Sequence, residues 1–160
     1  IGAVLVSDRV AHSLIQKGGD FAHGYTYSGH PVCAAVAVAN LKLMQGEGII
    51  EKVANDTGPY FQQRLAELAE HPLVGEARAV GMIGALELVV DKSSRRFFQP
   101  RGDMGTLCRD FALANGLILR ATKDTMLFSP PLVMDKPQID EMISLTRLSL
   151  DQAAASKGIT

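Results

Sequence analysis

A predicted helix that is apolar on nearly every side is the feature that most constrains how this chain can fold. The helix begins near His30, and Pro31 occupies its first turn, where the N–H that proline lacks would have no helical partner. Its apolar positions include Val32, Ala35, Val36, Val38 and Ala39. Since a helix of this kind is buried on most sides, we expect residues 1–45 to belong to a larger domain. The strand-like opening run IGAVLV has no methionine before it, so we expect a piece of a longer protein.

The rest of the chain follows two successive patterns. Across residues 46–72, apolar residues recur at helical spacing through Gly58 and Pro59, which predicts one long connecting helix with a kink at that pair. From residue 73 onward the hydrophobic period becomes two. The elements expected there are strands at 76–80, 83–90, 117–121 and 126–129, and helices at 106–115 and from 135 onward. This pattern therefore predicts that residues 73–160 form a compact α+β domain with helices on one face of its strands.

Composition and charge exclude several classes of function. The chain of 160 residues is 47% hydrophobic and 21% charged, which favours a folded core over disorder. Its formal net charge of −1 gives no electrostatic reason to bind nucleic acid or an acidic membrane. No apolar run is long enough to span a bilayer. We therefore expect no nucleic-acid or membrane partner. The 2 cysteines are too few for a disulfide framework, so we expect a cytoplasmic protein.

The stretch GYTYSGH brings hydroxyl groups to the start of the apolar helix. A helix N-terminus has free backbone N–H groups and a partial positive charge, and both attract anions. Thr26, Tyr27 and Ser28 could therefore help to bind a phosphate group. Alternatively, their hydroxyls could only accept hydrogen bonds from the N–H groups of the helix itself. The local pattern leaves both interpretations open.

Arg120 is a second candidate binding residue. It follows the apolar run of residues 117–119 near the expected end of a strand. A guanidinium group in a fixed position binds a carboxylate through two parallel hydrogen bonds. The alternative is an ordinary exposed arginine at a strand end, because arginine is mostly a surface residue.

Metal and nucleophile chemistry lack the residues that they need. His30 and Cys33 have a spacing that metal ligands use, but no second pair follows at ligand spacing, and a structural zinc site needs four ligands. Cys108 falls among the apolar positions of a predicted helix, and no G-x-S-x-G elbow is present. We therefore expect no metal site.

Three stretches taken together resemble one family. They are HGYTYSGHPVCAAVAVANL (residues 23–41), VGEARAVGMIGALELV (residues 74–89) and NGLILRATKDTMLFSPPLVM (residues 115–134). Their order and separation resemble the C-terminal part of the class III aminotransferases, which are pyridoxal-phosphate enzymes of fold type I. The greatest similarity is to the omega-aminotransferases that use pyruvate as the amino acceptor, and it covers essentially the whole chain.

The resemblance implies an α/β parent protein of two domains. In that architecture residues 1–45 are the C-terminal part of the large cofactor-binding domain, and residues 46–72 form a long connecting helix. Residues 73–160 form the small C-terminal α+β domain.

The resemblance also implies roles for single residues. Thr26 would bind the phosphate of pyridoxal 5′-phosphate in the active site of the partner subunit, assisted by the backbone at Tyr25, so the active sites would lie at the interface of a homodimer. Arg120 would bind the substrate carboxylate. In this family the Schiff-base lysine and the aspartate that pairs with the pyridine nitrogen lie upstream, and no lysine of this chain stands at the matching position. The resemblance therefore assigns no catalytic residue here, and we expect that this chain alone neither holds the cofactor nor transaminates.

The activity expected of the parent protein is transfer of an amino group from an amine, a diamine or an omega-amino acid to pyruvate or a similar keto acid. Two alternatives stay open. One is another pyridoxal-phosphate enzyme of the same fold, such as an aminomutase. The other is a non-catalytic dimerisation or ligand-binding module.

Overall fold

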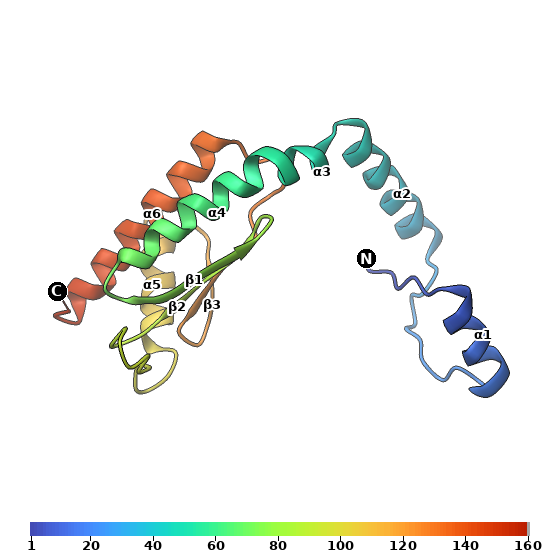
Figure 1. Ribbon diagram of the computed structural model, residues 1–160, viewed down its shortest axis with the longest axis horizontal. Coiled ribbons are helices and arrows are strands. Elements are labelled where there is room, and N and C mark those ends of the chain that lie inside the picture. The colour runs from blue at the N-terminus through green and yellow to red at the C-terminus, as the bar shows by residue number, and fades with distance from the viewer. Residues whose placement is uncertain (160) are drawn as a thin grey trace. The chain divides into compact units, whose positions relative to one another are not determined.

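The first of two compact units contains two helices. The computed structural model describes residues 1–159, and it divides into a unit from Ile1 to Glu47 and a unit from Gly48 onward. In the first unit, α1 (Asp8–Lys17) and α2 (Pro31–Gly46) are joined by an irregular segment (Figure 1). The strand expected at residues 1–6 is not formed, because a strand needs a hydrogen-bonded neighbour and none pairs with this run within residues 1–159.

Helix α2 begins at Pro31 as predicted, with His30 as its N-cap. Its long apolar side chains are nevertheless exposed. They are Val32, Val36, Val38, Leu41 and Leu43. The burial on most sides that the sequence predicts is thus not found among the residues that the structure describes.

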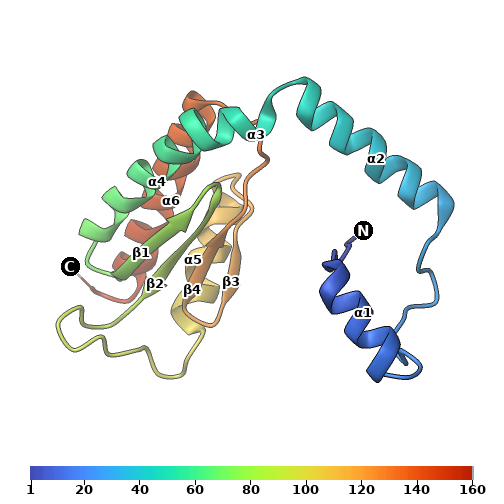
Figure 2. The same ribbon diagram turned by 45° about the vertical axis from the view of Figure 1, so that its right-hand side comes forward.

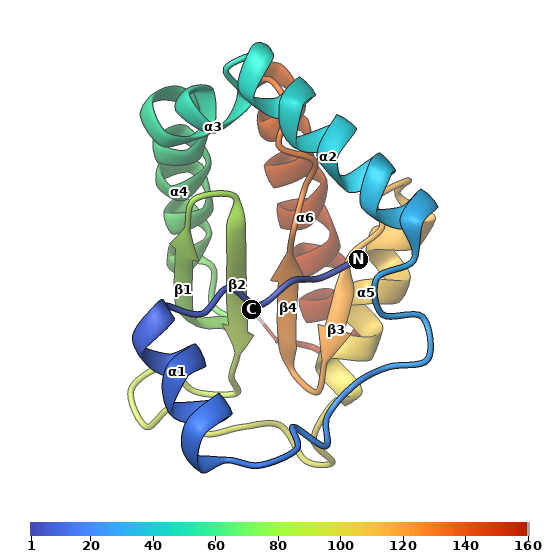
Figure 3. The same cartoon turned by 90° about the vertical axis from the view of Figure 1, so that its right-hand side faces the viewer.

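The second unit is an antiparallel sheet covered by helices on one face. Its elements in chain order are α3 (Ile49–Lys52), the π-helical η1 (Val53–Thr57), α4 (Gly58–Ala66), the 3₁₀-helical η2 (Glu67–Glu70), β1 (Val74–Val80), β2 (Ile83–Leu88), α5 (Asp103–Ala114), β3 (Arg120–Thr122), β4 (Thr125–Phe128) and α6 (Lys136–Ser156). The strand order is β1-β2-β4-β3, and every pair of neighbours is antiparallel. Helices α4, α5 and α6 all lie on one side of this sheet (Figures 2 and 3).

The long helix predicted through Gly58 and Pro59 is a succession of helical segments from Ile49 to Glu70. Its irregularity is the π-helical turn η1, in which the N–H of Gly58 donates to the carbonyl of Val53. Proline cannot donate to the helical ladder, and a π-helical turn is one way in which a helix absorbs such a break. Residue 58 must be small, because a Cβ there would lie 2.4 Å from the Val53 oxygen.

The core lies between the helices and the inner face of the sheet. Its largest fully buried side chains include Phe61, Leu65, Leu86, Phe128 and Ile139. Helix α4 packs so closely against β2 that a Cβ on Gly84 would lie 2.6 Å from Leu65 Cδ2 and 2.9 Å from Phe61 Cζ. Helix α4 therefore lies directly against the inner face of β2 at Gly84.

The outer face of the sheet carries the polar and charged residues. Arg78, Ala85, Leu127 and Arg120 stand in one row across the four strands, because Arg78 pairs with Ala85, Ala85 with Leu127, and Leu127 with Arg120. Side chains that are paired across antiparallel strands point to the same face. Both arginines therefore project from the face that the three helices leave open.

A helix that spans a membrane needs a minimum length and a high hydropathy. Within residues 1–159, no helix is both long enough and apolar enough to cross a membrane.

Candidate functional site

The hydroxyl-rich stretch forms a tight turn before α2. Residues 26–29 are in turn conformation, and the backbone N–H of Ser28 donates to the carbonyl of Tyr25 at 2.9 Å. The Ser28 hydroxyl oxygen in turn accepts a hydrogen bond from the N–H of Tyr25 at 3.1 Å. The His30 N–H closes the turn by donating to the carbonyl of Tyr27 at 3.2 Å. This backbone is therefore held in one shape by its own hydrogen bonds.

The helix cap is supplied by a side chain that sequence reasoning did not choose for that role. The His30 ring Nδ1 accepts a hydrogen bond from the backbone N–H of Cys33 at 3.4 Å. The hydroxyls of Thr26, Tyr27 and Ser28 make no bond to an N–H of α2 within residues 1–159. A histidine placed directly before a first-turn proline was the available signal, since that is the N-cap position.

Thr26 and Tyr25 are both exposed at this turn. Tyr25 lines a cavity of about 350 Å³, and Thr26 is not among the residues that line it. The lining residues are Ile1, Gly2, Tyr25, Tyr27, Ser28, Gly29, His30, Cys33 and Ala34. The Thr26 hydroxyl has no hydrogen-bond partner within the described chain, so it is chemically able to bind a ligand from outside this unit.

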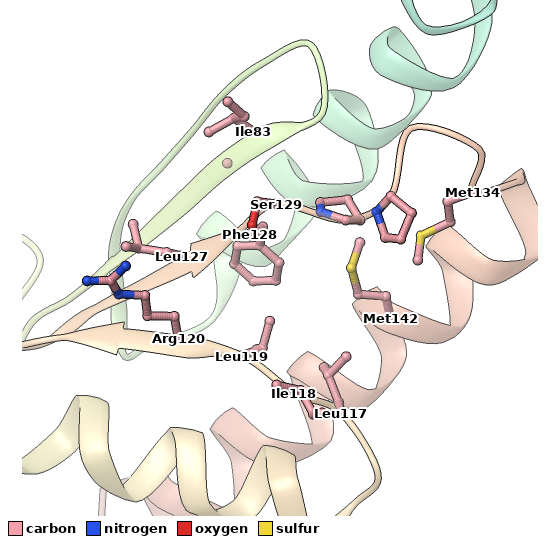
Figure 4. A pocket seen from close by; sticks show the side chains of 13 residues that line it. Ile83, Leu117, Ile118, Leu119, Arg120, Leu127, Phe128, Ser129, Met134 and Met142 are labelled. Atoms are coloured by element: carbon pink, nitrogen blue, oxygen red, sulfur yellow. The ribbon is translucent and has the colours of Figure 1, made fainter. Parts of the chain in front are cut away.

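Arg120 stands at one end of an apolar pocket in the second unit. It is the first residue of β3 and the only charged residue among those that line this cavity of about 470 Å³. Figure 4 shows Arg120 beside Leu127, with Met134 and Met142 at the opposite end. The remaining lining residues are Ile83, Gly84, Leu117, Ile118, Leu119, Phe128, Ser129, Pro130 and Pro131. A ligand with one carboxylate and a small apolar body would match this combination.

The partners of the two arginines in the cross-strand row are different. Arg78 forms ion pairs with Glu76 at 3.3 Å and with Glu87 at 3.6 Å. Arg120 has no acidic partner within residues 1–159, although its side chain is exposed on the same face. Its five N–H donors are thus available for a carboxylate, and Arg78 is already neutralised.

One of the two cysteines, Cys108, is buried, and the other, Cys33, is exposed. Burial raises the pKa of Cys108 to about 12, so its thiol stays protonated and is a poor nucleophile at neutral pH. Among residues 1–159, no group of three or more His, Cys, Asp or Glu side chains lies close enough together to hold a metal ion.

The chain has clear sequence relatives. The family described as "Aminotransferase class-III" matches residues 1–149. The chain is 56% identical over 156 residues to a putrescine–pyruvate aminotransferase of Pseudomonas aeruginosa, covering 98% of this chain and 34% of that protein. It is 39% identical over 148 residues to the mitochondrial gamma aminobutyrate transaminase 1 of Solanum lycopersicum, covering 91% of this chain and 28% of that protein. The chain thus spans about a third of the length of these relatives.

Solved structures have the same fold. The omega transaminase from Pseudomonas jessenii in complex with PMP superposes with a TM-score of 0.80 at 36% identity, covering 93% of this chain and 32% of that one. A transaminase obtained by ancestral reconstruction gives a TM-score of 0.85 at 41% identity, covering 94% of this chain and 34% of that one. The fold of the matched residues is therefore one found in solved transaminases.

Proposed function

Since the chain belongs to the class-III aminotransferase family, we propose that the whole protein is a pyridoxal-phosphate-dependent aminotransferase. Its amino acceptor is pyruvate or a similar keto acid, and its donor is an amine, a diamine or an omega-amino acid. Putrescine is the first donor to test, because the relative with 56% identity is a putrescine–pyruvate aminotransferase. In this proposal residues 1–45 belong to the large domain, residues 46–72 form the connecting helix and residues 73–160 form the small domain of a cytoplasmic protein.

One observation of this structure carries the proposal for the substrate. Arg120 is exposed at the end of an apolar pocket and has no acidic partner within residues 1–159. A guanidinium group that can form two parallel hydrogen bonds is well suited to a keto-acid carboxylate. The apolar lining would accept the methyl group of pyruvate, and it would exclude water from the bound carboxylate.

Two features of the turn before α2 support a role in phosphate binding. The exposed Thr26 hydroxyl has no partner in the described chain, and it precedes a helix of 16 residues whose N-terminus carries a partial positive charge. We propose that Thr26, with the backbone at Tyr25, binds the phosphate of the cofactor held by the partner subunit of a homodimer. Pyridoxal 5′-phosphate, when bound, supplies the electron sink for amino transfer, and the protein supplies orientation and charge.

The test compares acceptors with and without a carboxylate in the full-length protein. With putrescine as donor, Arg120→Ala should reduce kcat/KM for pyruvate by about 10²-fold, because one charge-assisted bidentate contact is lost. The kcat/KM for acetaldehyde, which lacks the carboxylate of pyruvate, should change by less than about threefold, since it offers the Arg120 guanidinium no carboxylate to bind.

Arg78→Ala is the matched control. It removes an arginine from the same row of the same sheet face, but that arginine is already paired with Glu76 and Glu87. Arg78→Ala should leave the acceptor ratio, which is kcat/KM for pyruvate divided by kcat/KM for acetaldehyde, unchanged. Equal losses for pyruvate and acetaldehyde in Arg120→Ala would refute the assignment of Arg120 to the carboxylate.

A further inference from the structure

Asp124 is a buried carboxylate that the proposed chemistry does not use. It is 2% exposed and lies in the two-residue turn between β3 and β4. Its Oδ2 accepts a hydrogen bond from the backbone N–H of Gly102 at 2.8 Å, and its Oδ1 accepts one from Gly105 at 3.1 Å. Among residues 1–159 it forms no ion pair, so two backbone N–H groups at the start of α5 hold this charge. An anion is favoured there because the N-terminus of a helix carries partial positive charge.

The turn and the helix are also in direct backbone contact. A Cβ built on Gly105 would lie 2.0 Å from the carbonyl oxygen of Lys123, so only glycine allows the turn to approach α5 this closely. The backbone of Lys123 has a φ of 53°, a left-handed conformation that residues other than glycine rarely adopt. The carbonyl of Asp124 accepts a hydrogen bond from the N–H of Leu88 at 2.8 Å, which ties the same turn to β2.

This anchoring determines where Arg120 lies. Strand β3 has three residues and lies at the edge of the sheet, and within residues 1–159 its one partner is β4. Arg120 is its first residue and the Lys123–Asp124 turn follows its last. An edge strand this short has little pairing of its own to fix its position, so its turn must be held from outside the ladder.

We propose that Asp124 is a positioning residue for carboxylate recognition. By binding the first turn of α5, it fixes the β3–β4 hairpin and thereby holds the guanidinium of Arg120 at the end of the apolar pocket. This inference rests on the proposed function, since it acts through the carboxylate contact of Arg120. A displacement of about 1 Å at a binding group is enough to reduce a rate by up to about 10²-fold.

The test is Asp124→Asn in the full-length holoenzyme with putrescine as donor. Asparagine has the same shape, but its side chain presents only one oxygen, and its NH₂ group faces a backbone N–H. We expect kcat/KM for pyruvate to fall by about tenfold or more, mainly through a higher KM, and kcat/KM for acetaldehyde to change by less than about threefold. Equilibrium binding of propionate, a plain monocarboxylate, should weaken by the same factor as pyruvate use.

Two further variants separate positioning from general stability. Gly105→Ala moves the turn away from α5 without changing any charge, and it should shift the acceptor ratio in the same direction. Asn115→Ala is the matched control, because it removes the hydrogen bonds from Asn115 to Ser149 and Gln152 at the opposite end of the same helix. It should destabilise the unit and leave the acceptor ratio unchanged.

A double-mutant cycle gives the decisive result. If Asp124 acts through Arg120, then Asp124→Asn should cause no further loss of pyruvate preference when Arg120 is already alanine. A full additional loss in that background would overturn the inference, as would equal losses for pyruvate and acetaldehyde in Asp124→Asn and Gly105→Ala. If Arg120→Ala itself leaves the acceptor ratio unchanged, the proposed role of Arg120 in carboxylate binding is wrong, and the role of Asp124 that depends on it is wrong as well. If Arg120→Ala changes the ratio and both turn variants leave it intact, only the role of Asp124 is wrong.

Discussion

His71 should make the second unit less stable in mild acid. Its side chain is 4% exposed and bonded on both ring nitrogens: Nδ1 accepts from the N–H of Leu73 at 3.1 Å, and Nε2 lies 3.1 Å from Asp151 Oδ1. Since Nδ1 must be an acceptor, the neutral ring carries its proton on Nε2 and donates it to Asp151. A second proton would have to go on Nδ1, where it would face the Leu73 N–H.

The sign of the pH effect follows from this geometry. Burial lowers the pKa of His71; the hydrogen bond and charge of Asp151 oppose that shift, and the charges of Arg147 and Lys92 reinforce it. In the unfolded chain the pKa is near 6.5. The unfolded state therefore binds more protons between the two pKa values, so the stabilisation is fully present above pH 6.5 and is lost as the pH falls toward the pKa of the folded state.

Two substitutions at this position separate titration from hydrogen bonding. His71→Asn keeps an oxygen close to the position of Nδ1, whereas His71→Leu leaves the buried Leu73 N–H without an acceptor. Because an unsatisfied buried N–H costs about 1–3 kcal/mol, His71→Leu should be less stable than His71→Asn by about 2 kcal/mol at pH 8. Both variants should lose the part of the pH dependence that His71 contributes between pH 7 and pH 5.

Hydrogen exchange at the Leu73 amide in the full-length protein is the appropriate assay, because it reports the opening free energy of this site rather than of the whole molecule. After correction for intrinsic exchange, protection in the wild type should decrease from pH 7 to pH 5, and protection in His71→Asn should stay nearly constant. The same decrease in both proteins would show that another group titrates, and the reasoning about His71 would be wrong.

Three other substitutions test separate parts of the structure. Thr26→Ala should raise the Kd of the full-length protein for pyridoxal 5′-phosphate by about tenfold to a hundredfold, the effect of one lost hydrogen bond to a charged group, with an unchanged Kd refuting the phosphate assignment. Gly84→Ala should lower the free energy of unfolding by about 1–3 kcal/mol, measured by denaturant titration, because its Cβ would lie 2.6 Å from Leu65 Cδ2. Thr122→Glu should place a carboxylate two residues from Arg120 on the same face of β3 and weaken pyruvate use by about tenfold at low salt, whereas Thr122→Gln should not.

The sheet was largely predictable from the sequence, and its edge strand was not. The period of two predicts β1 and β2 within two residues at each end, and the turn at Gly81 has the φ of 56° that glycine allows. The strand expected at 117–121 is instead formed by residues 120–122. In the register of β3 and β4, Ile118 and Leu117 would lie opposite Ser129 and Pro130, beyond the end of β4, and Pro130 has no N–H to donate.

The helix that follows the candidate phosphate site shows a second limit of the sequence pattern. Its start at Pro31 follows from the fixed φ of proline, and this part of the prediction is confirmed. The choice of capping group does not follow from residue types, since serine, threonine and histidine can all accept an N–H bond. The turn geometry decides it: the Ser28 hydroxyl is bonded to the Tyr25 N–H, and His30 is left to cap the helix.

The register of the sheet, rather than the identity of the residues, makes one arginine available to a ligand. Arg78 and Arg120 have the same side chain, the same face and the same cross-strand row. In the neighbouring row, Glu76 is opposite Glu87, so two carboxylates flank Arg78, and at the other edge the corresponding positions are held by threonines. A slip of one residue in β3 would turn Arg120 to the inner face, where its charge would be buried without a partner. The proposed carboxylate binding at this edge therefore depends on the contacts that fix the register of a strand of three residues, and the turn that contains Asp124 is the part of the structure placed to do so.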